Sequence, residues 1–330
     1  MEKQACKEKC TGCSIMIYSG ANYSIELDLS AELNKWAYDN LIQRGFCNVS
    51  LDNAFLQYCN MDLRLLTPKP RKIYVSRELV CPDSCREGYD FFMQAVKNGA
   101  DLLPFMSRSI CDVTSSDKMI FDWGLFHFHL ATEKYVADPR FMDRSDYLLI
   151  AYVGRDNDDV MYFLQIRPHI PSVWTEQEMI RILADNWPDT MEKHRIPGYA
   201  SLTENVTDEE YEQLRKNNIN SFVDLHDGRV YHGANGGLNS AGTSVRAVMK
   251  HNYFLNNAKQ CELAIGEMVD DLGATINKKL EEKAFSFKLN LIKPGYSDYL
   301  FEVDGYGILL QITILDGGKM RIVASDRTIT

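Results

Sequence analysis

The sequence predicts an α+β protein in which antiparallel sheets pack against helices and the chain forms two domains. Short runs rich in β-branched and aromatic residues follow one another, with turn-forming residues between them. Segments with helical spacing stand apart from these runs and do not alternate with them one by one, which favours α+β over a parallel βα design. A length of 330 residues exceeds what a single hydrophobic core usually fills.

Two helices are predicted in the first third of the chain. Apolar residues recur at helical spacing over residues 33–41, and Gly45 ends this helix. The second helix is predicted to begin at a capping box, Ser84-x-x-Glu87, in which each end of the motif satisfies a backbone amide of the other. It is predicted to end at Gly99, a residue that readily takes the left-handed conformation of a helix C-cap.

Three β-rich runs in the middle of the chain predict neighbouring strands of one antiparallel sheet, at residues 126–130, 147–153 and 160–167. Their short connections favour antiparallel pairing. A helix beginning at the capping box Thr175-x-x-Glu178 is predicted to back this sheet. The side chains expected to be buried there are Phe126, Phe128, Leu149 and Phe163.

The charged segment 189–198, which contains Pro197-Gly198, predicts a linker between a first domain of residues 1–190 and a second of 198–330. The second domain is expected to open with a helix at the capping box Thr207-x-x-Glu210. A hairpin should follow, with strands at 221–225 and 229–232 around an Asp-Gly turn.

The rest of the second domain is predicted as a glycine-rich segment, two helices and a β-meander. Residues 233–244 are rich in glycine and lead into a helix near Val245; they are either a phosphate-binding loop or a plain flexible loop. A long amphipathic helix is predicted over 257–282. The meander strands are expected at 285–292, 299–304, 308–315 and 319–325, with the last turn at 316–318.

The net charge of −10 and the pI near 5.3 argue against a protein that coats nucleic acid non-specifically, because such binding needs a broad basic surface. One local basic cluster exists, and a solvated loop is its simpler interpretation. Its members are Arg64, Lys69, Arg71, Lys72 and Arg77. No apolar run approaches about 18 residues, so no membrane partner is expected and the protein is predicted to be cytoplasmic.

Nine cysteines and no export signal predict reduced thiols and no disulfide framework. A zinc site that combines two cysteine pairs stays open as an alternative. The four residues in question are Cys10, Cys13, Cys81 and Cys85.

Two histidines provide the strongest chemical signal in the sequence. Read as a strand from Asp122 to Leu130, the chain places His127 and His129 on one face, and phenylalanines occupy the other. Imidazole both titrates near neutral pH and binds metals, so this pair indicates acid–base chemistry or a metal site. The third strand ends at His169, on the same face as Arg167 if the intervening proline leaves the strand straight. The alternative is a purely structural role for these imidazoles.

The order of strands, an arginine-containing loop, an acidic turn and a helix in this region resembles the strand core of the RelE, barnase and EndoU type of metal-independent ribonucleases. The resemblance lies in Tyr147-Leu-Leu-Ile-Ala-Tyr152 followed by Asp159-Val-Met-Tyr-Phe-Leu-Gln165, and covers about 70 of the 330 residues. Residues 101–130, with Ser107-Arg108 and Asp122-Trp-Gly124, are also similar to a group of bacterial proteins found in phage and defence contexts.

The resemblance implies cleavage of RNA with no metal or other cofactor. That reaction needs a base for the 2′-hydroxyl, an acid for the leaving 5′-oxygen and a cation for the phosphorane. Here the base is His127 or His129, the acid is His169, and the cation comes from Arg140, Arg144 or Arg167. The toxin-sized members of that type are compact and basic, whereas this chain is long and acidic, so a restricted substrate such as structured RNA is expected.

Two other functions stay open. A divalent-metal hydrolase would use His127, His129 and either Asp122 or His169 as ligands, with a water in the fourth position. A non-enzymatic protein would instead use the two domains as a binding module of a larger bacterial complex, with a protein partner or a second copy of the chain.

Overall fold

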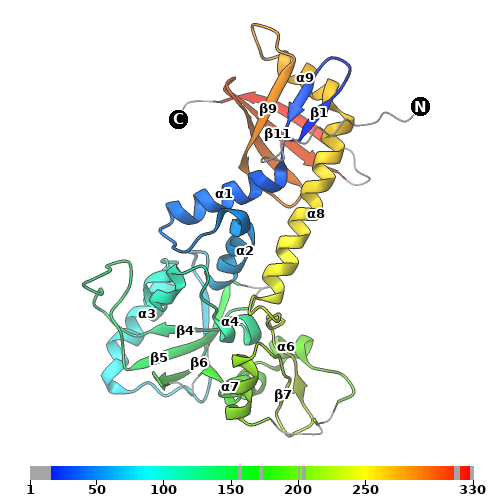
Figure 1. Ribbon diagram of the computed structural model, residues 1–330. Coiled ribbons are helices and arrows are strands. Elements are labelled where there is room, and N and C mark those ends of the chain that lie inside the picture. Colours follow the sequence, from blue (N-terminus) through cyan, green and yellow to red (C-terminus); the bar gives the residue numbers. More distant parts are fainter. Residues whose placement is uncertain are drawn as a thin grey trace. The chain divides into compact units, whose positions relative to one another are not determined.

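The computed structural model describes residues 16–154, 158–170, 174–199, 201–202, 206–315 and 320–327. Helices and mixed sheets coexist in these residues, which confirms the α+β class. The chain divides into two compact units (Figure 1). Unit 1 comprises the described residues up to Tyr58 and from Lys250 onward, and unit 2 runs from Cys59 to Met249. The segment 189–198, predicted as a linker, lies inside unit 2.

Unit 1 contains a six-stranded sheet with the order β1-β2-β9-β10-β11-β12. Strands β2 and β9 pair in parallel, and the other neighbours are antiparallel. The predicted C-terminal meander is confirmed, although its last turn at 316–318 lies outside the described residues. The strands are β1 (Ile17–Ser19), β2 (Ser24–Glu26), β9 (Ser286–Lys293), β10 (Asp298–Val303), β11 (Ile308–Ile314) and β12 (Met320–Asp326).

The single helix predicted over 257–282 is wrong. The structure has a helix α8 (Val245–Glu267) and a separate helix α9 (Val269–Asn277), because the backbone of Met268 leaves the helical conformation. The break places Asp270 in the first turn of α9, where its carboxylate accepts hydrogen bonds from backbone amides of the β1–β2 loop. The helix predicted at 33–41 is confirmed as α1 (Leu29–Gln43). A short turn η1 (Leu51–Asn53) and α2 (Ala54–Arg64) follow it.

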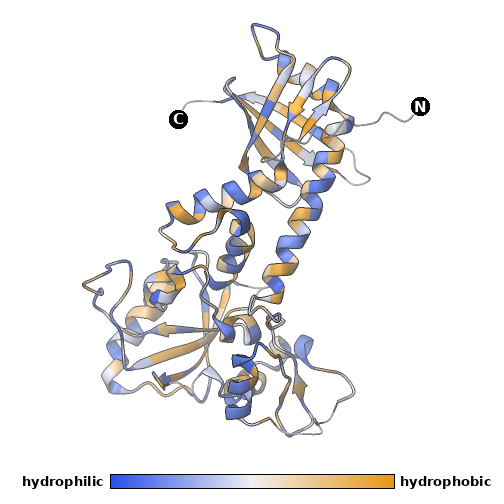
Figure 2. Cartoon of the chain, viewed as in Figure 1, coloured by the Kyte–Doolittle hydropathy of each residue, from blue (hydrophilic) through white to orange (hydrophobic). Residues whose placement is uncertain are grey.

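Unit 2 is built on a four-stranded sheet with the order β3-β6-β5-β4, here called the central sheet. The predicted antiparallel arrangement of three strands is confirmed by β4 (Leu125–His129), β5 (Tyr147–Tyr152) and β6 (Val160–Pro168). Strand β3 (Lys72–Val75), which pairs with β6 in parallel, was not predicted. These strands are largely hydrophobic in Figure 2, as expected of a sheet covered on both faces.

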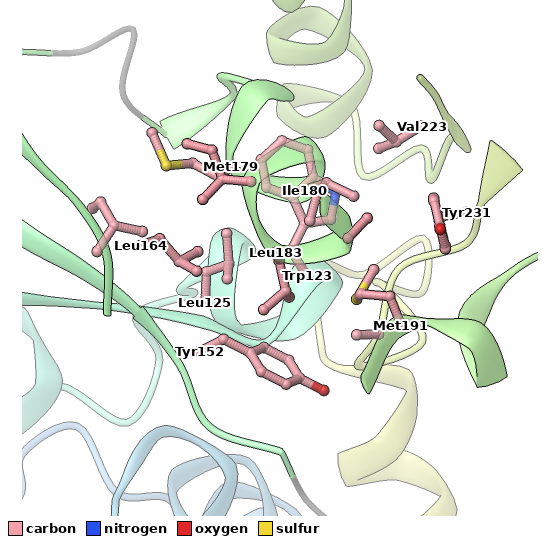
Figure 3. Packing of buried hydrophobic residues seen from close by; sticks show 14 of the residues in the cluster. Trp123, Leu125, Tyr152, Leu164, Met179, Ile180, Leu183, Met191, Val223 and Tyr231 are labelled. Atoms are coloured by element: carbon pink, nitrogen blue, oxygen red, sulfur yellow. The ribbon is translucent and has the colours of Figure 1, made fainter. Parts of the chain in front are cut away.

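Both faces of the central sheet are covered by helices. On one face, Phe92 of α3 (Arg86–Asn98) lies 4.6 Å from Phe128 and 5.8 Å from Phe163, measured between ring centroids. The four side chains predicted to be buried, those of Phe126, Phe128, Leu149 and Phe163, are all fully buried. The other face packs against α5 (Glu178–Asn186), and Figure 3 shows Met179 and Leu183 of this helix beside the strands. The predicted backing helix is therefore confirmed.

Two of the three predicted capping boxes are wrong. A turn η2 (Asp83–Cys85) precedes α3, whose N-cap is Cys85. Helix α5 has Gln177 as its N-cap, and the backbone amide of Gln177 donates to the Asp208 carboxylate. The box at Thr207 is confirmed at the start of α7 (Asp208–Lys216). A capping box is a local motif, and tertiary contacts displaced it at the other two sites.

The remaining elements of unit 2 are short. The predicted hairpin is present with two paired residues on each side, and residues 233–244 wrap around the end of α4. The elements are η3 (Leu103–Phe105), η4 (Arg108–Cys111), α4 (Lys118–Trp123), α6 (Pro188–Met191), η6 (Glu192–His194), β7 (Val223–Asp224) and β8 (Val230–Tyr231). Among the described residues, no helix combines the length and apolar character needed to cross a bilayer.

Candidate active site

The entry into β4 is set by a helix that the sequence analysis read as strand. Asp122 and Trp123 belong to α4, so the predicted strand over 122–130 is wrong at its start. The Asp117 side chain caps α4 by accepting from the backbone amide of Ile120, 3.1 Å away. Gly124 ends the helix in the left-handed conformation at φ 73°, which a side chain would disfavour. The next residue starts β4.

Strand register brings polar side chains together on the α5-facing side of the central sheet. His129 lies opposite Leu148, which lies opposite Arg167 on the next strand. In the neighbouring row, His127 and Gln165 flank Ile150 in the same way. Side chains in one cross-strand row project from the same face of a sheet. The two predicted histidines and two polar residues of β6 therefore share one face.

The three predicted histidines form one cluster with Trp174. The ring centroids of His129 and His169 are 5.6 Å apart, with the planes nearly parallel at 25°. Trp174 lies 4.6 Å from His127 and 5.9 Å from His169, edge to face in each case. These four residues are here called the histidine cluster. His129 is 6% exposed, whereas His169 lies on the surface.

Four buried polar atoms on this face make no hydrogen bond within the described residues. They are Nδ1 of His127, Nδ1 of His129, Oε1 of Gln165 and Nε of Arg167. Buried polar groups are almost always paired, so a group of orphans indicates a place that water or a ligand occupies. Their concentration on one sheet face distinguishes this region from an ordinary protein core.

Burial keeps the two strand histidines neutral. Burial, together with the neighbouring imidazoles and the positive charges of Arg144 and Arg108, lowers the pKa of His129 from 6.5 to about 4. Burial also lowers the pKa of His127, against the opposing effect of the Asp117 carboxylate, whose Oδ2 lies 3.8 Å from Nδ1. A neutral imidazole at pH 7 can accept a proton, as a general base must.

Folding stability should decrease as the pH falls from about 6.5 to about 4. In that range His129 takes up a proton in the unfolded chain and not in the folded one, so acid favours unfolding. The shift corresponds to roughly 3 kcal/mol below pH 4. Urea unfolding across this pH range should show a smaller pH dependence in His129→Gln than in the wild type. Identical pH dependence in both proteins would contradict the assigned burial of a neutral imidazole.

The predicted arginines differ in how they are engaged. Arg144 is exposed, and its charge acts on His129. Arg167 pairs with Glu176 at 2.7 Å, so part of its charge is neutralised. Arg140 is held by the Asp138 carboxylate at 2.8 Å. Arg108, which the sequence analysis did not select, also acts on His129 and lies over the Tyr135 ring at 4.0 Å.

A pocket of about 370 Å³ adjoins the cluster and is lined by His127 and Trp174. Further lining residues come from the segment before α4 and from α7, among them Asp117, Lys118 and Lys216. The lining cations are engaged: Lys118 Nζ donates to the backbone oxygen of Arg215 at 2.5 Å, and Lys216 pairs with Glu212 at 2.9 Å. Arg215, which also lines the pocket, pairs with Asp122 at 2.9 Å. The pocket therefore has few cations available for an anionic ligand.

Asp122, proposed as a metal ligand, is engaged elsewhere. Its Oδ2 accepts from the Arg215 guanidinium at 2.9 Å and from the Tyr211 hydroxyl at 2.9 Å. Both members of the ion pair are buried, and Arg215 lies 3.8 Å from the Trp123 ring centroid. Across the described ranges, no group of three or more histidine, cysteine, aspartate or glutamate side chains is placed to hold a metal ion. The Asp122 version of the metal site is therefore wrong.

The cysteines whose structure is described are all free thiols. The sulfurs of Cys81 and Cys85 lie 3.9 Å apart. Cys10 and Cys13, the other half of the alternative zinc site, lie outside the described residues.

The basic cluster and the glycine-rich segment serve the fold. Arg64 and Arg71 are buried and donate to backbone carbonyls, and Lys69 pairs with Asp158 and Asp159. The expectation of a solvated loop is therefore wrong for the two arginines, whereas Lys72 and Arg77 are exposed. In segment 233–244 the amides of Asn235 and Gly237 donate to carbonyls of α4, and most others find acceptors within unit 2. Amides used in this way are not available to cradle a phosphate.

Several site residues carried no usable signal in the sequence. Trp174 lies between β6 and α5, in a segment too short to show the hydrophobic periodicity of a helix or strand. Asp117 did carry one, because an aspartate three residues before an apolar helical residue is an N-cap pattern. The partnership of Asp122 with Arg215 joins residues 93 positions apart. Only folding brings such pairs together.

Comparison with known proteins gives no assignment. No family model, curated protein or solved structure matches the chain. The geometry of the histidine cluster therefore carries the functional interpretation.

Proposed function

We propose that this protein is a metal-independent endoribonuclease and that the histidine cluster performs acid–base cleavage of RNA. The observation that carries the proposal is the contact between His129, buried and neutral, and His169, exposed on the surface. Two imidazoles in different environments can take the two roles, base and acid, that phosphodiester cleavage needs. The resemblance of the strand core to RelE, barnase and EndoU type ribonucleases supports the same class of reaction.

The reaction proposed for the cluster is an intramolecular transesterification of the RNA. Neutral His129 takes the proton of a 2′-hydroxyl, whose oxygen attacks the adjacent phosphorus. The bond from phosphorus to the 5′-oxygen breaks, and protonated His169 gives its proton to that oxygen. The products are a 2′,3′-cyclic phosphate and a 5′-hydroxyl end. The ring centroids lie 5.6 Å apart, so both imidazoles are near enough to contact oxygens of one phosphodiester group.

Arginines beside the cluster supply the positive charge that the phosphorane needs. Arg144 is the best placed of the predicted arginines, because it is exposed and acts electrostatically on His129. Arg108 acts on the same imidazole. Arg167 has the weaker claim, since Glu176 already pairs with it. A preorganised cation at the site of developing charge lowers the barrier of such reactions substantially.

The substrate is proposed to be a restricted, structured RNA. The net charge is −10. In the basic cluster of the sequence, Arg64 and Arg71 are buried and donate to backbone carbonyls, which leaves Lys72 and Arg77 as its exposed cations. These residues therefore do not form the broad basic surface that binding of arbitrary RNA sequences requires. Recognition is expected to come from contacts at the site itself.

The proposal is tested by incubating the full chain with a structured RNA in the presence of excess chelator. Cleavage should persist, the 5′ fragment should end in a 2′,3′-cyclic phosphate, and a single 2′-deoxy substitution at the cut should abolish that cut. If the chelator stops cleavage, the result favours a metal-dependent hydrolase. Binding of RNA or protein without any cleavage would favour a binding module. Either result would overturn the proposal.

A further inference from the structure

We infer that the pocket beside His127 is a nucleobase subsite, in which a base of the RNA stacks on Trp174 and its N–H groups donate to Asp117. This inference rests on the proposed function and names how the same site selects its substrate. The pocket shares His127 and Trp174 with the histidine cluster, so a base held there belongs to a nucleotide next to the reacting phosphate. Its volume of about 370 Å³ falls within the range of about 300–1,000 Å³ for small-molecule sites.

Trp174 is suited to serve as the stacking surface. Its ring packs edge to face against both His127 and His169, and its backbone carbonyl accepts a hydrogen bond from Arg215. A ring held in this way loses little freedom when a base stacks on it. Stacking of one base on an aromatic side chain changes affinity by about 5- to 150-fold.

The charges around the pocket favour a neutral base with N–H donors. Asp117 uses Oδ1 to cap α4, whereas Oδ2 lies 3.8 Å from His127 Nδ1, too far for a hydrogen bond. That oxygen keeps its acceptor capacity on the pocket wall. The lining cations Lys118, Lys216 and Arg215 already have acceptors or an acidic partner, so none of them is available to hold a phosphate. A carboxylate oxygen has two lone pairs, so Oδ2 can accept from the two adjacent N–H donors that guanine offers on its pairing edge.

The inference is tested by calorimetric titration of the full chain with each of the four nucleoside 3′-monophosphates, which bind without being cleaved. Guanosine 3′-monophosphate should bind most tightly. Trp174→Ala should weaken it by about 5- to 150-fold, and Trp174→Phe should keep most of the affinity. Asp117→Asn, which can still cap α4, should reduce the preference for guanine by about 10-fold or more. Trp36→Phe, in unit 1, serves as the matched control and should bind as the wild type does.

The outcomes separate this inference from the proposed cleavage. Unchanged affinity in Trp174→Ala, a preference for another base, or a guanine preference that survives Asp117→Asn would overturn the subsite, whether or not RNA is cut. Base-selective binding that depends on both residues supports the subsite, even if the RNA assay shows no cleavage and the ribonuclease proposal falls. Thermal melts of each variant verify that a loss of binding is not a loss of folding.

Discussion

Replacing His129 by alanine is expected to lower the rate of RNA cleavage by roughly 10²- to 10⁴-fold, the usual contribution of a general acid or base. His169→Ala should have an effect of similar size, because it removes the acid that protonates the leaving 5′-oxygen. His232→Ala is the matched control, since His232 is also exposed in unit 2 but its ring contacts His194 and not the cluster. Single-turnover cleavage of one structured RNA measures all three rates.

The pH profile gives a readout that a purely structural role would not produce. With the pKa of His129 at about 4, the acidic limb of kcat/KM should lie near pH 4, below the ordinary histidine value of 6.5. Unchanged cleavage in His129→Ala and His169→Ala would refute the catalytic assignment. A strongly lowered melting temperature in both His129→Ala and His129→Gln, with cleavage retained by the folded fraction, would assign the imidazole to the fold alone.

Arg215→Ala is expected to reduce the free energy of unfolding by about 3–5 kcal/mol. The substitution leaves the Asp122 carboxylate buried with one hydrogen bond from Tyr211 and no countercharge. It also removes a guanidinium that stacks on the Trp123 ring, inside the cluster of apolar side chains drawn in Figure 3. An uncompensated buried charge costs far more than the loss of a surface contact.

Lys216→Ala, at the next position of the same helix, is the matched control. Its ion pair with Glu212 is largely exposed, and such pairs one helical turn apart contribute about 0.3–0.5 kcal/mol. Denaturant unfolding of the two variants measures the difference. A loss in Arg215→Ala no larger than that in Lys216→Ala would show that the Asp122–Arg215 pair does not hold α4 and α7 together.

Where the sequence carries long regular alternation, it predicted the elements well. The runs that became β4, β5 and β6 alternate so clearly that both their pairing and their buried phenylalanines could be predicted. The four-strand meander of unit 1 was predicted for the same reason. A strand must bury every second side chain, so the pattern is local and visible.

Short elements and helix starts were predicted poorly. Strands β1, β2 and β3 have three or four residues each, too few for a period to be recognised. Motifs at Ser84 and Thr175 looked like capping boxes, but the actual N-caps lie one and two residues further on, at Cys85 and Gln177. In the second case Asp208, from another helix, supplies the acceptor. A cap depends on which partner is nearest, and tertiary packing decides that.

The sequence by itself determined that His127 and His129 face the same side of a strand, because alternation in an extended chain follows from backbone geometry alone. Only the tertiary structure decided what surrounds them. Folding places His169 and Trp174 against the strand histidines, and it pairs Asp122 with Arg215 away from them. It also buries His129 deeply enough to lower its pKa. These features depend on contacts between distant segments and on the exclusion of water, and neither is encoded in the spacing of neighbouring residues.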